Sequence, residues 1–349
     1  MMRNFDYSKI NEIKWDSEIL SLITAIYHYK GKTEFFIKQE SKKLDQLVEN
    51  TKNVSTMTSN EIEGIITTTQ RFKKIMANKI LPRNKNEKEI MGYKEILNII
   101  NDNFEDLPLS KNYILQMHKI MLKYTNNPLA GKIKNVQNYI TINYADGNQE
   151  ILFKPISPFE TPIALEKICD EFNQAINNFL VEPLILIPIF IHDFLCIHPF
   201  NDGNGRISRL LTTLLLYKSG FFVSKYVSLE SLIANTKIDY YQALQIAGIN
   251  WHEEKEDVIP FIKYILGIIL AGYKELKDKS FVIEEKLLAI DIVRKAISLK
   301  MGSFSKQDIC ELCPTLSLSS IERSLRNLVQ LGEIKLKGIG KKIRYTKLK

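Results

Sequence analysis

The chain has 349 residues, of which 45% are hydrophobic and 25% are charged, and its formal net charge is +8. These values are typical of an ordinary soluble protein and leave room for two or three domains with a real hydrophobic core. Four cysteines are too few for a disulfide framework, and the most apolar run, residues 184–191, is too short to span a bilayer. No N-terminal signal pattern is present, so we expect a cytoplasmic protein with no membrane partner.

Helical patterns dominate the first third of the chain. Residues 1 to about 50, 86–103 and 114–124 each repeat apolar side chains at helical spacing. Between the first two of these segments, residues 55–72 gather serines and threonines ahead of two glutamates. That is an N-cap pattern, and taken locally it predicts the start of a helix.

The pattern then changes from helical to alternating. Residues 136–143 and 150–154 contain β-branched and aromatic side chains, and Asp146-Gly147 between them is a turn signal. These segments predict a single β-hairpin whose edge stays free in an otherwise helical chain. Helical spacing returns in residues 161–180.

The most informative stretch is residues 198–209, HPFNDGNGRISR. It follows an apolar helical run over 184–197 and precedes another over 210–217, so we expect a tight loop that turns into the N-terminus of a helix. Gly203 and Gly205 lack a Cβ, which lets backbone amides approach an anion closely, and a helix start favours negative charge. The stretch therefore predicts a phosphate-binding loop.

The side chains of this stretch extend that chemistry. Arg206 and Arg209 lie one helical turn apart and can both present guanidinium groups to phosphate oxygens. Asp202 is suited to holding Mg²⁺ together with phosphate oxygens, and His198 is suited to taking a proton near neutral pH. Phe200 is expected to anchor the loop in the core. Together they predict transfer of a phosphoryl-type group from a nucleotide to a hydroxyl; the alternative is a glycine-rich turn with surface charges.

The stretch resembles the motif HxFx(D/E)GNGRxxR of the Fic (Fido) family at every defined position. The resemblance implies a mainly α-helical Fic core that moves AMP from Mg²⁺-ATP to a Ser, Thr or Tyr hydroxyl of a target protein, which can be the chain itself. It makes His198 the base that takes the hydroxyl proton and Asp202 the Mg²⁺ ligand. The residues that it implies for nucleotide binding are Gly203, Asn204, Gly205, Arg206 and Arg209, with Arg209 on the γ-phosphate.

A second motif resembles the inhibitory sequence (S/T)xxxE(G/N) of autoinhibited Fic proteins. Ser59, Glu63 and Gly64 match it, and they precede the core, as in the class with an N-terminal inhibitory helix. The resemblance implies that Glu63 pairs with Arg209 and so keeps that arginine from the γ-phosphate. Some family members use this glutamate to remove AMP, which gives Glu63 an alternative hydrolytic role.

Two further roles follow from the resemblance. The hairpin is placed as a flap, residues 137–154, on which a target protein docks by strand addition. Tyr240 and Tyr241 are placed beside the adenine pocket. The sequence departs from the family at Gly248, where an Asn is common, and at Ile156, where a proline is common.

The C-terminal segment carries most of the net charge. Residues 283–349 contain 14 Lys and Arg against 7 Asp and Glu. The expected elements are helices over 287–299, 305–312 and 317–331 and paired strands over 333–336 and 343–347, an order that indicates a winged helix-turn-helix. The expected partner is DNA, and the alternatives are a protein partner or a merely solvated basic face. The basic residues concerned are Arg323, Arg326, Lys341, Lys342 and Arg344.

The sequence thus predicts a helical region over 1–105, a Fic core over 106–275 and a winged helix over 283–349. The leading hypothesis is an autoinhibited protein adenylyltransferase that needs Mg²⁺ and ATP. A de-AMPylase that uses the same site is one alternative, and a nucleotide-sensing DNA-binding regulator without turnover is another. An oligomer is compatible with all three.

Overall fold

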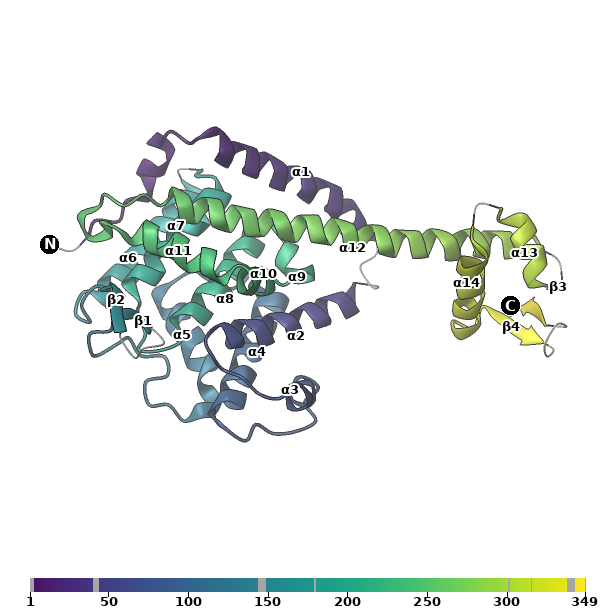
Figure 1. The fold of residues 1–349 in the computed structure, drawn as a ribbon, viewed down its shortest axis with the longest axis horizontal. Coiled ribbons are helices and arrows are strands. Elements are labelled where there is room, and N and C mark those ends of the chain that lie inside the picture. The colour runs from purple at the N-terminus through teal and green to yellow at the C-terminus, as the bar shows by residue number, and fades with distance from the viewer. Residues whose placement is uncertain are drawn as a thin grey trace. The chain divides into compact units, whose positions relative to one another are not determined.

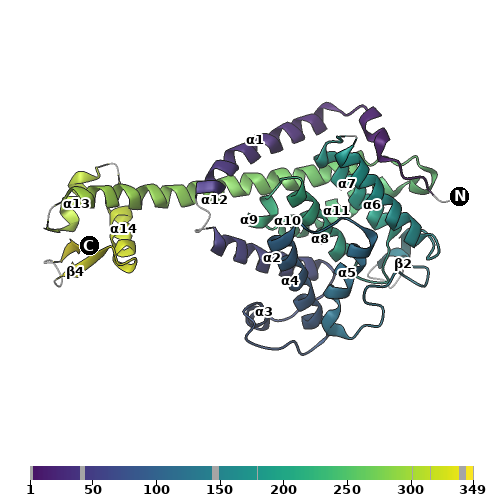
Figure 2. The same cartoon turned by 180° about the vertical axis from the view of Figure 1, so that it is seen from behind.

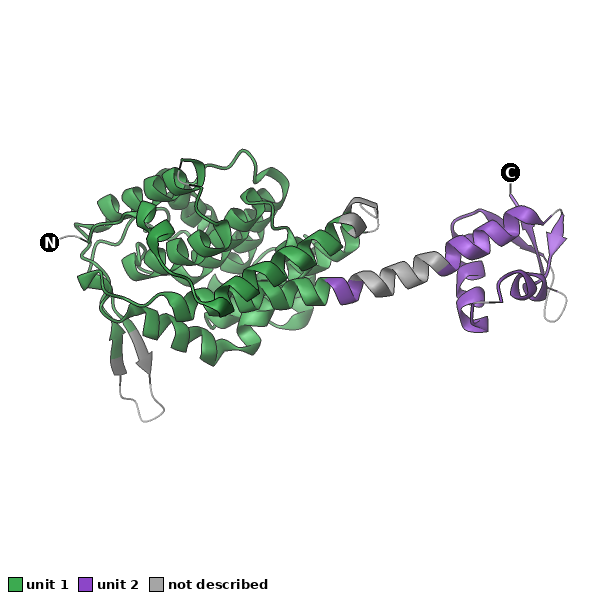
Figure 3. Ribbon diagram, turned by 90° about the horizontal axis from the view of Figure 1, so that it is seen from above, with its two compact units in different colours: residues 1–276 green, residues 277–349 purple. Residues whose placement is uncertain are grey.

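The computed structural model describes residues 3–39, 44–143, 149–178, 180–300, 302–314, 316–337 and 343–348. The chain forms two compact units, residues 1–276 and residues 277–349 (Figure 3). The described part is mainly helical, as the sequence predicts (Figure 1). None of its helices combines the length and the apolar character that crossing a membrane requires. The finer division at residues 105 and 283 stays a prediction.

Unit 1 is built from helices and one hairpin. Its helices are, in chain order, α1 Ser17–Gln39, α2 Asp45–Ile62, α3 Thr69–Met76, α4 Lys85–Asn103, α5 Lys111–Met121, α6 Thr161–Asn177, α7 Pro183–Ile197, α8 Asn204–Lys218, α9 Val223–Tyr226, α10 Leu229–Asn235, α11 Lys237–Gly248 and the first part of α12 Ile259–Leu299. Short 3₁₀ turns occupy Tyr7–Glu12, Lys123–Thr125 and Trp251–Glu253.

Helix α7 forms the centre of unit 1. Every residue from Leu184 to Ile197 is buried, because this run is apolar on all sides of the helix apart from His192 and Asp193. It packs between α6 and α8. The buried Asp193 carboxylate accepts hydrogen bonds from the Tyr7 hydroxyl and the Trp251 indole, both at 2.7 Å. The adjacent His-Asp pair is therefore part of the core.

The N-cap interpretation of residues 55–72 is wrong, because their first half is the C-terminal part of α2. The hydroxyls at 55 and 59 are turned into the protein: Ser55 Oγ donates to Ser228 Oγ at 2.9 Å, and Ser59 is fully buried. The helix ends at Ile62, with Glu63 as its C-cap, and Gly64 follows with a φ of +74°. Helix α2 lies against α4 and α10 (Figure 2). Tertiary burial of these hydroxyls overrides the local capping preference.

The hairpin is present, and its first strand is shorter than expected. Strand β1 covers Ile140–Asn143 and pairs antiparallel with β2, Gln149–Phe153, with Thr141 opposite Ile151. In the described chain this sheet has two strands. The predicted turn at Asp146-Gly147 lies outside the described residues.

Unit 2 differs from expectation in its first element. The helix expected over 287–299 is the last part of one 41-residue helix, α12. Residues 261–286 contain no proline that would break the helix before that point. After α12 come β3 Ser303–Phe304, α13 Lys306–Leu312, α14 Leu318–Gln330, β4 Ile334–Lys337 and β5 Arg344–Lys347.

The strands of unit 2 form one antiparallel sheet in the order β3-β5-β4, of which β3 was not expected. Val293, Phe304 and Leu325 are among the buried side chains of a separate core in this unit. Lys341 and Lys342 lie outside the described residues.

Gly92 sets the distance between α4 and the end of α5. A Cβ at this position would overlap the main-chain carbonyl of Met121, whereas a Cβ at Gly267 in α12 would meet nothing within 4 Å. We expect Gly92→Ala to lower the free energy of unfolding by about 1–3 kcal/mol, because α4 and α5 must separate. Gly267→Ala should raise it by about 0.5–1 kcal/mol, as alanine is the better helix former. Denaturant titration measures both, and equal effects would contradict the packing at Gly92.

Candidate active site

His198 lies at the junction between α7 and the loop that leads into α8. It takes a left-handed conformation, φ 52° and ψ 62°. Its Nδ1 is 3.1 Å from the Leu195 carbonyl, which can only accept, so Nδ1 carries the proton in the neutral ring. The lone pair on Nε2 is then available. Burial lowers the pKa of His198 to about 4, and the nearby Lys134 charge acts in the same direction.

The loop closes through Asn204. Its side chain accepts from the Phe200 amide at 2.9 Å and donates to the Phe200 carbonyl at 2.7 Å. Phe200 is fully buried, as expected, and stacks on His118 with ring centroids 3.8 Å apart. Gly203, with φ +86°, then starts α8 and has no side chain to cap the first amides. The uncapped N-terminus of a 15-residue helix is suited to an anion.

Arg206 is fully buried and lies against α4. Its Nη1 donates to Glu89 Oε2 at 2.5 Å, and its Nη2 lies 3.7 Å from Asp202 Oδ1. Nε and Nη2 are buried without a hydrogen-bond partner among the described residues. Unpartnered buried donors are rare, and here they fit an anion held beside the loop. The sequence gave no signal for Glu89, which lies 117 positions from Arg206.

Asp202 has the exposure that a metal ligand on a nucleotide needs. Its side chain is 61% exposed, and its main-chain carbonyl is 3.1 Å from His118 Nε2. The Gly131 amide donates to His118 Nδ1, so both ring nitrogens of this buried histidine have a partner. No cluster of three or more His, Cys, Asp or Glu is found in the described chain. A single open carboxylate beside an anion site fits Mg²⁺ held mainly by phosphate oxygens and water.

Arg209 makes its contacts with the end of α2. Nε donates to Ser59 Oγ at 2.8 Å, and Nη2 donates to the Ser59 carbonyl at 2.9 Å and to Glu63 Oε1 at 2.8 Å. The arginine side chain is 4% exposed and that of Glu63 is 32% exposed. A Cβ at Gly205 would overlap Glu63 Oε1, so the carboxylate occupies the space directly over Gly205. The two arginines of the motif therefore face different partners in this structure.

Two contacts that the sequence analysis missed hold α2 in this position. Lys237 Nζ donates to the carbonyl of Ile62, the last residue of α2, at 3.0 Å. The Ser228 hydroxyl bridges Ser55 and the Glu230 carboxylate. A cation at a helix C-terminus is favourable there, but only the fold brings residue 237 to residue 62.

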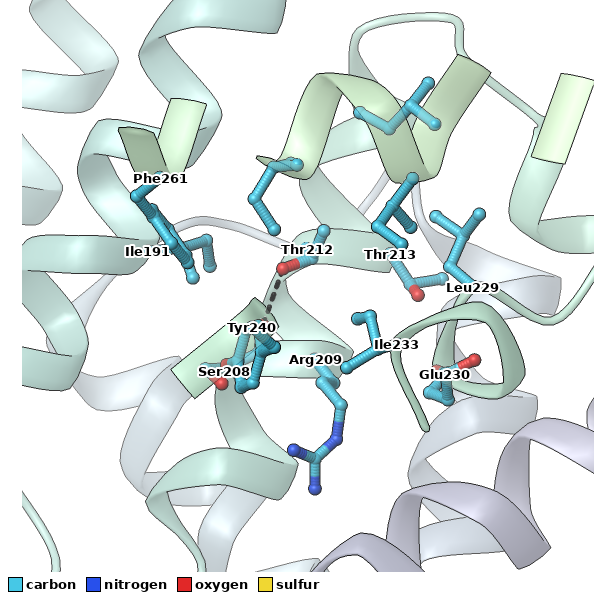
Figure 4. Close-up of a pocket in the computed structure, with 13 residues that line it drawn as sticks. Ile191, Ser208, Arg209, Thr212, Thr213, Leu229, Glu230, Ile233, Tyr240 and Phe261 are labelled. Carbon is cyan, nitrogen blue, oxygen red and sulfur yellow. Dashed lines mark hydrogen bonds between the residues drawn. The ribbon is translucent and has the colours of Figure 1, made fainter. Parts of the chain in front are cut away.

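Tyr240 and Tyr241 have different environments. Tyr240 is 4% exposed and Tyr241 is 43% exposed, with ring centroids 5.3 Å apart. Tyr240 lines a cavity of about 20 Å³ behind Arg209, shared with apolar side chains such as Phe261 (Figure 4). The guanidinium of Arg209 points away from this cavity. Its volume suits one water molecule and not a nucleobase. A position of Tyr240 and Tyr241 beside an adenine stays a prediction.

The chain contains a Fic domain. The Fic/DOC family profile matches residues 108–216, which include the loop, α7 and most of α8. A Fic family protein of Desulfovibrio desulfuricans has a similar fold, with a TM-score of 0.64, 19% identity and coverage of 96% of this chain and 97% of that one. A structure of Fic-1 from Caenorhabditis elegans gives a TM-score of 0.58 at 22% identity, covering 74% of this chain and 71% of that one.

Curated relatives carry names of one activity. The protein adenylyltransferase fic-1 of C. elegans is 28% identical over 180 residues, which are 51% of this chain and 31% of that protein. The protein adenylyltransferase Fic of Nematostella vectensis is 26% identical over 219 residues, 59% of this chain and 44% of that protein. The chain thus spans less than half the length of these relatives.

His118, His192 and His198 should stay uncharged well below neutral pH, because burial lowers the pKa of each from 6.5 to about 4. The unfolded chain takes up protons between these two pH values that the folded chain does not. The free energy of unfolding should therefore fall as the pH drops from 6.5 towards 4. NMR titration, with His198→Ala to assign the ring signal, measures the His198 midpoint. A midpoint near 6.5 would contradict the buried environment.

Proposed function

We propose that this protein transfers AMP from ATP to a hydroxyl group of a protein. The single observation that carries the proposal is the position of the free His198 Nε2 beside the uncapped N-terminus of α8 and the unpartnered donors of Arg206. The Fic domain and the names of the curated relatives support the same activity.

In the proposed step the target hydroxyl attacks the α-phosphorus of ATP. His198 Nε2 takes the hydroxyl proton as the new P–O bond forms, and the bond from the α-phosphorus to the bridging oxygen breaks, so that pyrophosphate leaves. The α8 amides and Arg206 hold the phosphates by donating to their oxygens. Asp202 would hold Mg²⁺, which supplies positive charge to the phosphates. Before the step, His198 is neutral at physiological pH, as a base must be.

Glu63 inhibits this step in two ways. It engages Arg209, which is then not free for a terminal phosphate. Its carboxylate also occupies the space over Gly205, where a phosphate would otherwise lie against the first amides of α8. Because like charges repel, an ionised Glu63 and a phosphate cannot share that position. A nucleotide bound while α2 stays in place is therefore displaced from the geometry of in-line attack.

Replacing Glu63 tests the function and its inhibition together. We expect Glu63→Gly to raise the rate of label transfer from α-³²P-ATP to protein by on the order of 10-fold or more, because both obstructions are removed. Glu61→Gly is the matched control: it removes an exposed carboxylate from the same turn, and its rate should equal that of the wild type.

Glu63→Gly combined with His198→Ala should give no transfer, and mass spectrometry of modified lysate proteins should locate an added AMP on a hydroxyl side chain. Equal rates for Glu63→Gly and the wild type would remove the inhibitory role. No transfer by either would remove the proposed activity, and loss of AMP from a premodified protein with Glu63 intact would favour the de-AMPylase alternative.

We also propose that the flap receives the target protein. Within the described chain β1 pairs only with β2, which leaves its other edge open to strand addition. The segment just before β1 is hydrogen-bonded to the catalytic loop, through Asn138 Nδ2 and the Phe200 carbonyl at 3.0 Å. A peptide on β1 would therefore pass close to His198.

A second candidate function, binding of duplex DNA by unit 2, has a specific observation in its favour. Residues 277–349 hold 16 Lys and Arg and 8 Asp and Glu, so of the chain totals of 48 and 40, unit 1 retains 32 of each. Asp291, Asp308, Glu322 and Glu333 are all ion-paired with Arg294, Lys300 or Lys306. The remaining described basic residues therefore carry the excess charge.

The sheet gathers part of this excess on one face. Lys337 lies directly opposite Arg344 and Lys335 opposite Thr346, while Ile334 faces the core. Like charges opposite each other destabilise a sheet, and the phosphates of a polyanion would relieve that repulsion. Arg323 and Arg326 on α14, the second helix of the α13–α14 pair, add two exposed cations. With this sheet as its wing, unit 2 is best interpreted as a winged helix.

A charge-reversal pair tests DNA binding. We expect the full chain to bind a fluorescein-labelled duplex of arbitrary sequence at low salt. Lys337→Glu should weaken binding several-fold and reduce the salt dependence of log Kd by about one. Lys295→Glu, an equal charge change at an exposed position on α12, should leave the salt dependence as in the wild type. Fluorescence anisotropy measures both; identical losses for the two variants, or no binding by the wild type, would refute the assignment.

A further inference from the structure

Four consecutive main-chain carbonyls around the catalytic histidine accept hydrogen bonds from Lys134 and Asn138. Lys134 Nζ donates to the Ile197 carbonyl at 2.9 Å, and the Lys134 amide donates to the Pro199 carbonyl at 2.8 Å. Asn138 Nδ2 lies 3.3 Å from the His198 carbonyl and 3.0 Å from the Phe200 carbonyl. The two side chains also contact each other, Lys134 Nζ donating to Asn138 Oδ1 at 3.0 Å.

These contacts stabilise a stretch of backbone whose conformation is unfavourable on its own. His198 has φ 52°, which is unfavourable for a residue with a side chain and persists only where the surroundings fix it. A helix that ends also leaves carbonyls without partners. Lys134 and Asn138 supply those hydrogen-bond partners from outside α7. They do so at His198, whose backbone sets the direction of the imidazole ring.

Lys134 is a charged residue in a buried position, where its desolvation costs free energy of folding. It is 2% exposed, and no carboxylate forms an ion pair with it in the described chain; its acceptors are neutral oxygens. Burial lowers the pKa of its ammonium group to about 8. A buried charge without a counter-charge costs stability, so its retention beside the loop points to a role in the function of that loop.

We propose that Lys134 and Asn138 are positioning residues that fix the loop 197–200 so that His198 presents Nε2 to the nucleotide. The proposal rests on the proposed transfer of AMP, and it assigns a task to a segment outside the motif. The same segment leads into the flap: Gln137 Nε2 donates to the Pro155 carbonyl at 2.9 Å, which closes the base of the hairpin. The loop and the flap are therefore held by three residues within five positions.

The test uses the full chain with Glu63→Gly as the parent. Lys134→Met keeps the aliphatic stem and removes the donor, whereas Lys134→Arg keeps a charged donor. Asn138→Asp keeps the acceptor for Lys134 but loses the donor to the carbonyls at 198 and 200. We expect Lys134→Met and Asn138→Asp to lower kcat by on the order of 10- to 100-fold, as a misplaced base does, with KM for ATP within about twofold of the parent. Lys134→Arg should recover most of kcat.

Lys132→Met is the matched control, an exposed lysine two positions away, and its kcat should equal that of the parent. Asn138→Asp distinguishes an effect on the position of the loop from an effect on stability. The new carboxylate can pair with Lys134 and keep the protein folded, so the melting temperature should not fall. Unchanged kcat in Asn138→Asp and Lys134→Met, or a raised KM with unchanged kcat, would overturn the proposal.

NMR titration of the His198 ring provides a readout that does not need turnover. The charged groups acting on the ring are Lys134, Glu63 of α2 and Asp202 of the loop. The Lys134 charge lowers the pKa of His198, so Lys134→Met should raise the His198 midpoint above that of the Glu63→Gly parent. If the parent transfers no AMP, the proposed function fails while this titration still decides the positioning role. An unmoved midpoint in both Lys134→Met and Asn138→Asp would then refute it.

Discussion

The contact between Glu63 and Arg209 is the interaction that determines how the end of α2 lies against the first turns of α8. It joins the end of α2 to the first turns of α8, and it does so from the side on which the uncapped amides of α8 are open. Ser59 accepts two further hydrogen bonds from the same guanidinium group, so Nε and Nη2 of Arg209 both donate to the end of α2. In the proposed function, the Glu63 carboxylate lies where a phosphate would bind and pairs with the cation that would hold that phosphate.

The cations around the loop are each tied to a different part of the fold. Arg206 pairs with Glu89 on α4, Arg209 with Glu63 at the end of α2, and Lys134 with the carbonyls of the loop itself. Helices α2 and α4 precede the family-matched region, residues 108–216. The N-terminal helices are therefore part of the site, because two of its buried charges would lack their counter-charges without them.

Unit 2 shows how charge separates within one chain. Unit 1 has equal numbers of basic and acidic residues. Unit 2 has an excess of positive charge, part of which lies on α14 and on one face of its sheet. The nearby acidic residues Glu322 and Glu333 form ion pairs with Lys306 and Arg294. A surface with this charge attracts polyanions, and this attraction does not depend on unit 1.

Residues 198–209 were sufficient to predict a tight loop that turns into a helix start, because Gly203, Gly205 and the apolar runs on either side are local signals. Phosphate binding by this loop stays a prediction. The helical class and the hairpin followed from side-chain periodicity in the same way. The resemblance to the inhibitory motif implied one contact between distant segments, that of Glu63 with Arg209. The sequence could not determine the others: Glu89 with Arg206, Lys237 with the end of α2, and Lys134 with the loop around His198. The serines of α2 were misassigned for this reason, since a buried hydroxyl and a helix cap have the same local sequence. Only the tertiary structure distinguishes them, because burial of charges and hydroxyls depends on which surfaces meet, and that is decided by packing across the whole chain.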